Sequence, residues 1–600
     1  MRFKSRKTGG YQVYAVCGTN TVSFAIDAGT PGKGGADTKG LLGFAVERED
    51  ATENERYYML GFKVFQSVIP QPDETTTVST YAQPIQSFVW DDFTAKPARS
   101  YTYWFHPLKG SPKNLDRNAA PIKIVIETEP LYSENEHDIF FNRGIASSQA
   151  YARKFGNKKP SDLQPPSKQK EAWEWLSRSL DDAILGFIAQ ARKGDTLLGC
   201  FYEFSYRPVV DALKAAHDKG VDVQLILDGK KKYDKNGTLQ PSFPREDTLK
   251  TIKAAKLPQS CIARLREARP SEIEHNKFMV LLKGKKQVPT AVWTGSTNIS
   301  EGGIFGQTNV GHWLRDPATA VIYQNYWDLL KTDPGGKRGD DAATVRKKNA
   351  AYKDAVEALQ AVPSDWHKIP AGVTPVFSPR QGLSVLDMYA AALDEAKALS
   401  CITLAFGVAD VFKSLLQNNT AMDHLTFLLL EKRDKPDPKS KKPFIVINAK
   451  NNVYQAWGAY LRDPLYQWTA ETNNRALGLN THVSYIHSKF LLVDPLGGDP
   501  LTVTGSANFS AASTQDNDEN MLLIRGNKRV ADIYFTEFNR LFFHYYFRSV
   551  QEATLQRGDR GNDGTLFLDE TDSWLAKYKP GSLKRKRVQI VAGMQGAKTI

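Results

Sequence analysis

The sequence predicts a duplicated α/β fold preceded by a small antiparallel β-sandwich domain. Three observations support this fold class: roughly the first 130 residues contain only short β-rich runs, the order strand, helix, strand occurs twice further along, and each occurrence is followed by the same two polar motifs. Strands that alternate with helices indicate a parallel sheet, whereas regularly spaced short strands indicate a sandwich. A chain of 600 residues is long enough for both parts.

Residues 1–135 are predicted to form the β-sandwich as an accessory domain. Turn-forming stretches separate its short β-rich runs at 11–16, 41–46, 57–65, 85–90, 101–105 and 122–127. The run that carries Tyr101 and Tyr103 is similar to the tyrosine-bearing late strand of fibronectin type III and immunoglobulin-like domains. We expect such a domain to dock or recognise rather than to catalyse, and the sequence does not specify its role further.

A stretch rich in Lys, Pro, Ser and Gln at 156–170 marks the boundary that follows the β-sandwich. The predicted division of the remaining chain is a linker at 136–170, a first α/β half at 171–335, a helical connector at 336–380, a second α/β half at 381–555 and a basic C-terminal tail at 556–600.

The elements of the two halves follow the same order. In the first half, the apolar pattern predicts a helix, a strand, a helix and a strand at 173–192, 196–204, 208–219 and 221–227. In the second half, the corresponding segments are 385–399, 401–406, 411–417 and 425–430. Because the repeat extends over whole elements, an internal duplication is the simplest explanation.

The chain is basic, with a net charge of +13, and its field would attract polyanions such as nucleic acid or anionic lipid surfaces. Local concentrations of Lys and Arg are expected to be solvated loops or tails, at 230–232, 439–442 and 584–587. No signal-peptide core follows the basic start, and no long uninterrupted apolar stretch occurs, so we expect a soluble, cytoplasmic protein of bacterial type. The four cysteines have neither CxxC nor zinc-finger spacing and are expected to be reduced, buried thiols.

Each half carries a His-x-Lys motif at the start of an apolar run and a Gly-Ser-x-Asn motif after the next run. These motifs contain His275, Lys277, Gly295, Ser296 and Asn298 in the first half, and His487, Lys489, Gly505, Ser506 and Asn508 in the second. The separation from His to Asn is 23 residues in one copy and 21 in the other. Either motif alone is common, but two ordered copies at nearly equal spacing indicate a functional site.

The residue types in these motifs suit a phosphate group. Side chains at positions i and i+2 of a strand point to the same face, so each His-x-Lys pair presents an imidazole and an ammonium group to one site. The Gly-Ser-x-Asn turn adds a carboxamide and backbone donors, and its glycine would permit close approach of an anion.

The two motifs resemble those of the phospholipase D superfamily, in which His-x-Lys is followed by an Asp five residues after the Lys, and then by Gly-Ser-x-Asn. The second half matches throughout, with Asp494 at the Asp position, whereas Leu282 stands there in the first half. The resemblance covers residues 170–550 and implies a duplicated phospholipase D-like α/β sandwich with two halves related by a pseudo-twofold axis. Because the motif Asp of this family supports the fold around the site, Leu282 does not exclude activity.

The family also has an acidic residue 11 positions after the motif Asn. That residue is Glu519 in the second half, and Asn309 occupies the same position in the first. A carboxylate beside an imidazole fixes its tautomer and stabilises its charged form. We therefore predict that Glu519 orients His487 and that Asn309 holds His275. The alternative is that Asp516, Asp518 and Glu519 form an ordinary polar loop.

The resemblance implies a metal-independent phosphodiesterase, a hydrolase in which one imidazole attacks phosphorus to form a phosphohistidine while the other protonates the leaving oxygen and then activates water. It favours His275 as the nucleophile and His487 as the acid and base. The catalytic set is completed by Lys277, Lys489, Asn298, Asn508 and Glu519, and the motif Gly and Ser residues are predicted to bind substrate. The sequence shows no cluster with metal-ligand spacing, and no cofactor is expected.

Three functions remain open. Nucleic acid is the favoured substrate, because a basic chain would find DNA or RNA through its phosphate backbone. The second hypothesis is a phospholipase D that hydrolyses phospholipid headgroups, and the third is a non-catalytic binding protein that retains the fold. His482 and His312 have no counterpart in the other half and are expected at structural or rim positions, and the tryptophans are expected in the core. The sequence does not indicate an oligomeric state.

Overall fold

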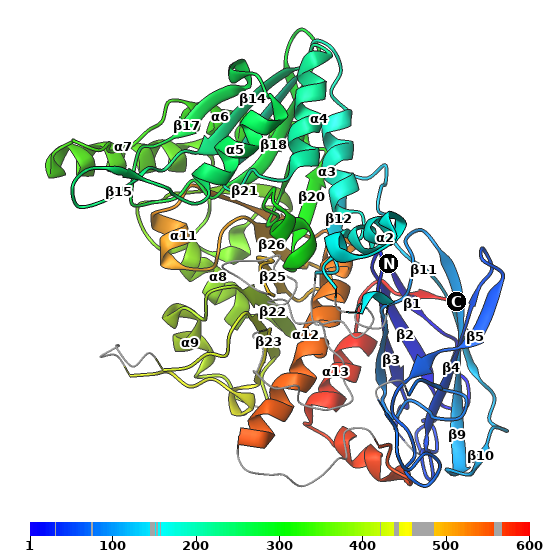
Figure 1. Ribbon diagram of the computed structural model, residues 1–600. Coiled ribbons are helices and arrows are strands. Elements are labelled where there is room, and N and C mark those ends of the chain that lie inside the picture. Colours follow the sequence, from blue (N-terminus) through cyan, green and yellow to red (C-terminus); the bar gives the residue numbers. More distant parts are fainter. Residues whose placement is uncertain are drawn as a thin grey trace.

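The computed structural model describes residues 1–30, 32–73, 76–144, 151, 154–156, 158–420, 422–436, 443–458, 485–556 and 567–600, and for 547–556 it describes the backbone alone. Three bodies lie together: a β-sandwich that contains both ends of the chain, a first α/β half and a second α/β half (Figure 1). His482 and the basic run at 439–442 lie outside the described residues.

The predicted N-terminal β-sandwich is confirmed. Its first sheet has the strand order β28 (Lys598–Thr599), β1 (Arg2–Lys4), β2 (Gln12–Cys17), β3 (Val22–Asp27) and β8 (Val89–Asp92). Its second sheet has the order β10 (Asn114–Asp116), β9 (Ser100–Ser111), β4 (Gly43–Asp50) and β5 (Glu55–Tyr58), and β11 (Ile122–Glu127) also pairs with β9. A small hairpin of β6 (Leu60–Gly61) and β7 (Val78–Ser79) lies apart from both sheets.

Aromatic rings fill the space between the two sheets of the sandwich. The ring of Phe24 lies 4.8 Å from that of Tyr103 and 5.3 Å from that of Phe105, measured between centroids. The hydroxyl oxygen of Tyr101 accepts a hydrogen bond from the backbone N–H of Lys96, five residues upstream, at 2.9 Å. This contact is the one expected of a tyrosine-bearing strand at the corner of such a sandwich.

The first half is built on a seven-stranded mixed sheet. Its strand order is β12 (His137–Phe141), β20 (Val310–Leu314), β19 (Val288–Gly295), β18 (Lys277–Lys283), β13 (Thr196–Phe201), β14 (Asp222–Asp228) and β17 (Ile262–Arg266). Strands β13, β14 and β17 are parallel, and the others pair antiparallel. The helices are α2 (Pro166–Ser177), α3 (Leu180–Ala189), α4 (Arg207–Asp218), α5 (Arg245–Ala255), α6 (Pro317–Lys331) and α7 (Ala342–Leu359), and a short hairpin consists of β15 (Lys232–Tyr233) and β16 (Leu239–Gln240).

The second half repeats this sheet strand for strand. Its order is β21 (Gly372–Ser378), β27 (Glu519–Arg525), β26 (Leu501–Gly505), β25 (Phe490–Val493), β22 (Leu399–Leu404), β23 (Leu425–Leu430) and β24 (Val453–Trp457). Its helices are α8 (Ser384–Asp394), α9 (Asp410–Leu416), α11 (Ala511–Gln515) and α12 (Lys528–Gln556). The identical strand order in the two halves confirms the predicted duplication.

Three features differ from the predicted elements. The helix expected at 173–192 is two helices, α2 and α3, because Arg178 and Ser179 adopt positive φ angles of 49° and 68°. Strand β12 lies in the segment expected to be a linker, and β21 lies in the expected helical connector. Both are edge strands whose apolar residues complete a sheet, and a single short run of this kind carries no repeat signal. The exact domain boundaries stay predictions.

The expected basic tail is folded over its described residues, 567–600. A 3-10 helix at Asp572–Tyr578 leads into α13 (Leu583–Ala592), and β28 then pairs in parallel with β1. The indole of Trp574 is fully buried in the sandwich core and donates to the backbone oxygen of Leu41 at 2.8 Å. The basic run at 584–587 lies on α13, so it is a helix and not a solvated tail.

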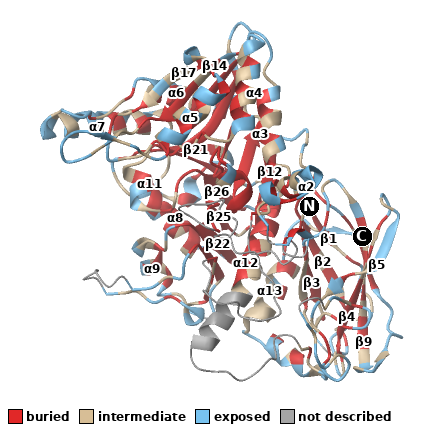
Figure 2. Cartoon of the chain, in the orientation of Figure 1, coloured by how far each residue is buried: buried red, intermediate tan, exposed pale blue. Residues whose placement is uncertain are grey.

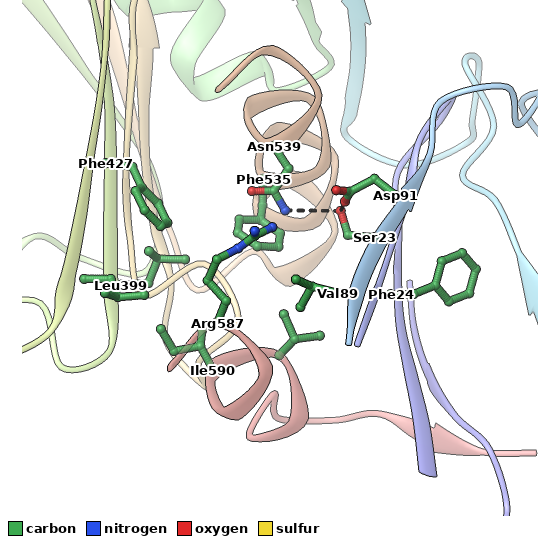
Figure 3. Close-up of a pocket in the computed structure, with 12 residues that line it drawn as sticks. Ser23, Phe24, Val89, Asp91, Leu399, Phe427, Phe535, Asn539, Arg587 and Ile590 are labelled. Atoms are coloured by element: carbon green, nitrogen blue, oxygen red, sulfur yellow. Dashed lines mark hydrogen bonds between the residues drawn. The ribbon is translucent and has the colours of Figure 1, made fainter. Parts of the chain in front are cut away.

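A small pocket marks the junction of the β-sandwich, the second-half sheet, α12 and α13 (Figure 3). On one wall, the hydroxyl of Ser23 donates to Asp91 at 2.6 Å and accepts from the side-chain amide of Asn539 at 3.1 Å. Arg587 enters from α13, with its guanidinium 3.5 Å from the ring centroid of Phe543. The pocket therefore brings polar groups from three parts of the chain together.

Buried residues concentrate in the two α/β sheets and in the interior of the sandwich (Figure 2). One hydrophobic cluster contains residues from both halves and from α12, so the two halves share a core and are not independent domains. Over the described ranges, no helix combines the length and apolar character that crossing a bilayer demands.

Candidate active site

The two His-x-Lys motifs lie at the starts of the central strands β18 and β25, and segments of the opposite half hold them together. The backbone N–H of His275 donates to the carbonyl of Asp518 at 2.9 Å, and that of Thr308 donates to the carbonyl of Tyr485 at 2.8 Å. Isolated β-bridges join Glu274 to Asp518 and Thr308 to Ile486. Each motif therefore lies beside the segment that follows the Gly-Ser-x-Asn motif of the other half.

This arrangement exchanges the two predicted imidazole partners. The Nδ1 atom of His275 lies 2.9 Å from Oε2 of Glu519, and the Nδ1 atom of His487 lies 2.9 Å from Oδ1 of Asn309. The prediction that Glu519 orients His487 and Asn309 holds His275 is therefore wrong. The prediction assumed that each histidine is oriented by a residue of its own half. The β-bridges between the halves instead place each orienting side chain beside the histidine of the other half.

The hydrogen bonds of the orienting residues set the tautomer of both imidazoles. Oδ1 of Asn309 also accepts from the hydroxyl of Ser296 at 2.8 Å, while its amide donates to the carbonyl of Gly303 at 2.7 Å. Oε2 of Glu519 likewise accepts from the hydroxyl of Ser506 at 2.7 Å. Because both partners accept, each histidine carries its proton on Nδ1, and the lone pair of Nε2 is left for chemistry.

The motif Ser and Gly residues make structural contacts, and their role in binding substrate stays a prediction. The two Ser hydroxyls hold the orienting residues, as described above. A Cβ atom on Gly295 would lie 2.3 Å from the carbonyl oxygen of Val310, and one on Gly505 would lie 2.2 Å from that of Asn520. Both glycines are therefore required for close packing against the neighbouring strand. Close approach of an anion, the reason expected from the sequence, stays a prediction.

The two lysines have the same geometry in both halves. Nζ of Lys277 donates to the carbonyl of His275 at 2.6 Å, and Nζ of Lys489 donates to the carbonyl of His487 at 2.6 Å. Both side chains are fully buried. Burial lowers the pKa of Lys277 to about 8, against the raising effect of Glu519, and burial together with the charge of Lys277 lowers the pKa of Lys489 well below its usual range. A bound anion would offset the positive charge of these two buried lysines.

Both imidazoles are neutral near pH 7. Burial lowers the pKa of His275 to about 4, although the Glu519 carboxylate opposes the shift. Burial and the positive charges of Lys489 and Lys277 lower the pKa of His487 well below its usual value. Lys489 also lowers the pKa of His275, so each histidine senses the lysine of the opposite half. These mutual effects show that the two motifs share one electrostatic environment.

The carboxamide of Asn298 makes a contact that the sequence did not predict. Its Nδ2 atom donates to Oε1 of Glu203 at 2.7 Å, so one amide hydrogen is used and the second is available to a ligand. Asn508, in the second half, is half-buried. Glu203 was visible as the last polar residue of a predicted strand, at the carboxyl edge where sites of parallel sheets lie, and that position was the signal that could have identified it.

Tyr202, next to Glu203, is a second site residue that sequence reasoning missed. Its ring centroid lies 5.0 Å from that of His275, and Nζ of Lys277 lies 5.5 Å from it. The ring therefore flanks the imidazole and the ammonium group of the first half.

A buried carboxyl group precedes the first motif. Oε1 of Glu274 accepts from the backbone N–H of Asn276 at 3.0 Å and from the thiol of Cys200 at 3.2 Å. Burial, reinforced by the charge of Asp518, raises the pKa of Glu274 to about 8. The side chain is therefore protonated over most of the neutral range. Within the part of the chain that the structure describes, no group of three or more His, Cys, Asp or Glu side chains is arranged to hold a metal ion.

The structure also accounts for Leu282. In the second half, the Asp494 carboxylate accepts from the backbone N–H groups of Lys397, Ala398 and Leu399, at 2.8, 2.7 and 3.2 Å. In the first half, Asp195 provides the carboxylate from the adjacent strand. It accepts from the backbone N–H groups of Arg192 and Gly284, each at 2.8 Å. In both halves, a carboxylate thus links the ends of two neighbouring strands through backbone N–H groups. In the second half the carboxylate follows β25, and in the first half it precedes β13.

His312 lies at the expected structural position. Its Nε2 atom is 2.9 Å from Nδ1 of His137, and its Nδ1 atom is 3.0 Å from the hydroxyl of Tyr534, so both nitrogens have partners within the core. Trp173 and Trp175 are partly buried against the core of the first half, which agrees with their expected place.

A family model for the phospholipase D-like domain of cardiolipin synthase matches residues 184–330 and 442–542, which include both motif pairs. No curated protein sequence matches the chain. Solved structures that are similar to the chain include phosphatidylserine synthase from Haemophilus influenzae Rd KW20, at 12% identity and a TM-score of 0.40, covering 64% of this chain and 91% of that one. A phospholipase D family member, Nuc from Salmonella typhimurium, is 20% identical, with a TM-score of 0.19, and the match covers 25% of this chain and 84% of that one. Polyphosphate kinase from Porphyromonas gingivalis is 11% identical, with a TM-score of 0.35, and the match covers 59% of this chain. The chain spans less than half of that kinase, 46% of its length.

Proposed function

The chain belongs to the phospholipase D superfamily, and from that membership we propose that it is a metal-independent phosphodiesterase that works through a phosphohistidine intermediate. The observation that carries the proposal is the reciprocal pairing of the two imidazoles, each oriented through Nδ1 by a side chain of the opposite half. This pairing supports one shared site in which both Nε2 atoms act on a single phosphate.

In the first step, the lone pair of Nε2 of His275 attacks phosphorus, and the bond from phosphorus to the leaving oxygen breaks. The imidazole becomes positively charged as the N–P bond forms, and the Glu519 carboxylate stabilises that charge. This role of Glu519 favours His275 over His487 as the nucleophile.

The leaving oxygen takes a proton from Nε2 of His487. His487 is neutral in the free protein, but the negative charge of a bound diester offsets the two ammonium groups and raises the pKa of His487. In the second step, neutral His487 accepts a proton from water as the water attacks phosphorus, and the N–P bond breaks to release the phosphomonoester and His275. Lys277, Lys489 and the motif carboxamides contact the phosphate oxygens.

Nucleic acid is the proposed substrate. The net charge of +13 would draw a polyanion toward a site that already contains two buried lysine side chains. A phospholipid headgroup is the second candidate. It is favoured by the exposed side chain of Phe406, which follows strand β22 at the carboxyl edge of the second-half sheet and is 68% exposed.

The test offers plasmid DNA, single-stranded DNA, RNA and phosphatidylcholine vesicles to the protein, with and without EDTA. We expect turnover that EDTA does not change and that His275→Ala and His487→Ala both abolish. An acid-labile phosphate on the peptide that contains His275, detected by mass spectrometry after a rapid quench, would identify the nucleophile. Turnover that EDTA abolishes would contradict the mechanism, and no turnover of any diester would indicate a non-catalytic binding protein.

A further inference from the structure

The carboxyl edge of the first-half sheet carries a projection that the proposed chemistry does not use. Residues 230–243, called the basic hairpin below, connect β14 to α5 and contain β15 and β16. Figure 1 shows β15 extending away from the sheet, beside the segment that leads into α7. Because β14 ends next to the catalytic motif, the basic hairpin begins beside the site.

Positive charge dominates the basic hairpin. It carries four lysines, at 230, 231, 232 and 235, and a single carboxylate, that of Asp234. Asp234 serves the turn itself, accepting from the backbone N–H groups of Asn236 and Thr238 at 2.9 and 2.8 Å. Lys231 pairs with Glu267 at 2.8 Å, whereas Lys232 and Lys235 are exposed. Lys232 and Lys235 therefore give the basic hairpin an exposed positive charge that suits an anionic ligand.

Aromatic rings connect the basic hairpin to the catalytic histidine. Phe243, at the end of the basic hairpin, is 45% exposed, and its ring centroid lies 6.2 Å from that of Tyr202. The ring of Tyr202 lies 5.0 Å from that of His275. On β15, the ring of Tyr233 is stacked against the guanidinium of Arg338, which lies 3.4 Å from the ring centroid. Tyr202 and Phe243, the aromatic row, thus lead from the imidazole to the surface.

The aromatic row lies on the first-half side of the site, next to His275. By the pairing of β13 with β18 and of β22 with β25, Ala405 is the second-half equivalent of Tyr202. A chain-like ligand would therefore find rings next to His275 and none at the matching position next to His487. The site can distinguish the two directions of an asymmetric strand.

We propose that the basic hairpin and the aromatic row bind single-stranded nucleic acid, with bases stacked on Phe243 and Tyr202 and phosphates near Lys232 and Lys235. The inference rests on the proposed function, and it names the form of the substrate. A single strand offers unpaired base faces to aromatic rings and a backbone to lysines, whereas the bases of a duplex are already stacked and paired. Tyr202 is half-buried and its ring lies 5.0 Å from that of His275, so a base stacked on it would place the adjoining phosphate near the catalytic groups.

Binding is tested by fluorescence anisotropy with a labelled single-stranded oligonucleotide and with the corresponding duplex. Phe243→Ala should weaken binding of the single strand by about tenfold and leave duplex binding nearly unchanged. The double variant Lys232→Glu and Lys235→Glu should weaken binding and reduce the dependence on salt between about 50 and 200 mM. The matched control is Lys285→Glu with Lys286→Glu, in the exposed turn at the far end of β18, which should bind as the wild type does.

Hydrolysis of the small diester bis(4-nitrophenyl) phosphate separates the two proposals, because it needs the catalytic groups alone. The hairpin variants should keep this activity, and His275→Ala should lose it. If the wild type binds single strands through the hairpin but cleaves no diester, the proposed function fails and the binding surface stands. If Phe243→Ala and the lysine variant bind single strands as tightly as the wild type, or if they lose only turnover of phosphatidylcholine vesicles, the inference is overturned.

Discussion

At the scale of single residues, the chemistry of the site depends on one difference between the halves, Glu519 in the second against Asn309 in the first. Both side chains accept a hydrogen bond from Nδ1 of a histidine, but only the carboxylate can stabilise a positive charge on the ring. The histidine that becomes phosphorylated carries that charge. Under the proposed mechanism, the exchange of partners across the halves therefore favours His275 as the nucleophile.

Replacement of the carboxylate tests this assignment. Glu519→Gln keeps an acceptor for Nδ1 and removes the charge, so formation of the phosphoenzyme should slow by about 10²- to 10⁴-fold, measured in a single turnover. Asn309→Asp is the reciprocal variant and should leave this step largely intact. If Glu519→Gln slows only the hydrolysis of the intermediate, Glu519 does not serve the nucleophile.

The pH profile of kcat/KM reports the protonation of the free protein. His275 must be neutral to attack, and its pKa of about 4 places the acid limb near that value, with activity falling as the pH drops through it. The proposed acid His487 must be protonated, and its pKa in the free protein lies well below the usual value, so kcat/KM should also fall as the pH rises above that pKa. It should fall further as Lys277 loses its charge near its pKa of about 8. Measurement of kcat/KM from pH 3 to 10 checks both limbs, and an acid limb near the ordinary histidine pKa would contradict a buried neutral nucleophile.

The buried acid Glu274 affects stability and not chemistry. Its pKa of about 8 in the folded protein lies above the ordinary value of 4.5, so between these values the folded state retains a proton that the unfolded chain has lost. Raising the pH through this window therefore lowers the free energy of unfolding, by up to about 1.4 kcal/mol per pH unit. Glu274→Gln should flatten that slope in urea unfolding from pH 5 to 8. An unchanged slope would show that Glu274 ionises normally.

At the scale of elements, an apolar pattern that recurs in both halves predicted helices and strands well, whereas single edge strands were not predicted. Strands β14 and β23 and helices α4 and α9 lie within a residue or two of their predicted segments, because each has its own apolar pattern and a counterpart in the other half. Edge strands β12 and β21 lack both signals. The residues of the site were predicted from their spacing, but the exchange of Glu519 and Asn309 depends on contacts between halves, which no local pattern contains.

The two carboxylates that tie strand ends together should contribute to stability in equal measure. Asp494→Ala removes the acceptor of three backbone N–H groups, and Asp195→Ala removes the corresponding acceptor in the first half. Each variant should lower the free energy of unfolding by about 2 kcal/mol. Asp499→Ala, at an exposed pair with Arg525, is the matched control and should have little effect. A loss confined to Asp494→Ala would mean that Asp195 is not its counterpart.

At the scale of the whole molecule, the β-sandwich is fastened to the second half by a buried side chain near the start of the chain. The guanidinium of Arg2 donates to Asp532 on α12 at 2.8 Å and to the carbonyls of Pro495 and Leu496 at 2.7 and 2.8 Å. The two carbonyls directly follow the motif residue Asp494. The β-sandwich thus contacts the loop that follows β25, the strand of the second His-x-Lys motif.

Loss of this contact should weaken the attachment of the sandwich. Arg2→Met leaves Asp532 buried with a partner missing, so the free energy of unfolding should fall by about 3 kcal/mol in chemical denaturation. Arg6→Met, at an exposed position four residues away, provides the comparison. Identical unfolding of the two variants would show that the contact contributes nothing to the attachment.

The parallel pairing of β28 with β1 has a consequence for how the protein is made. The strand formed by residues 2–4 is synthesised long before its neighbour in the sheet, which is formed by residues 598 and 599. At about 5 to 20 residues per second, translation of the intervening chain takes roughly half a minute to two minutes. Throughout that time one border of the sheet lacks its partner, so the nascent chain needs protection from edge-to-edge association until residues 598 and 599 have been made.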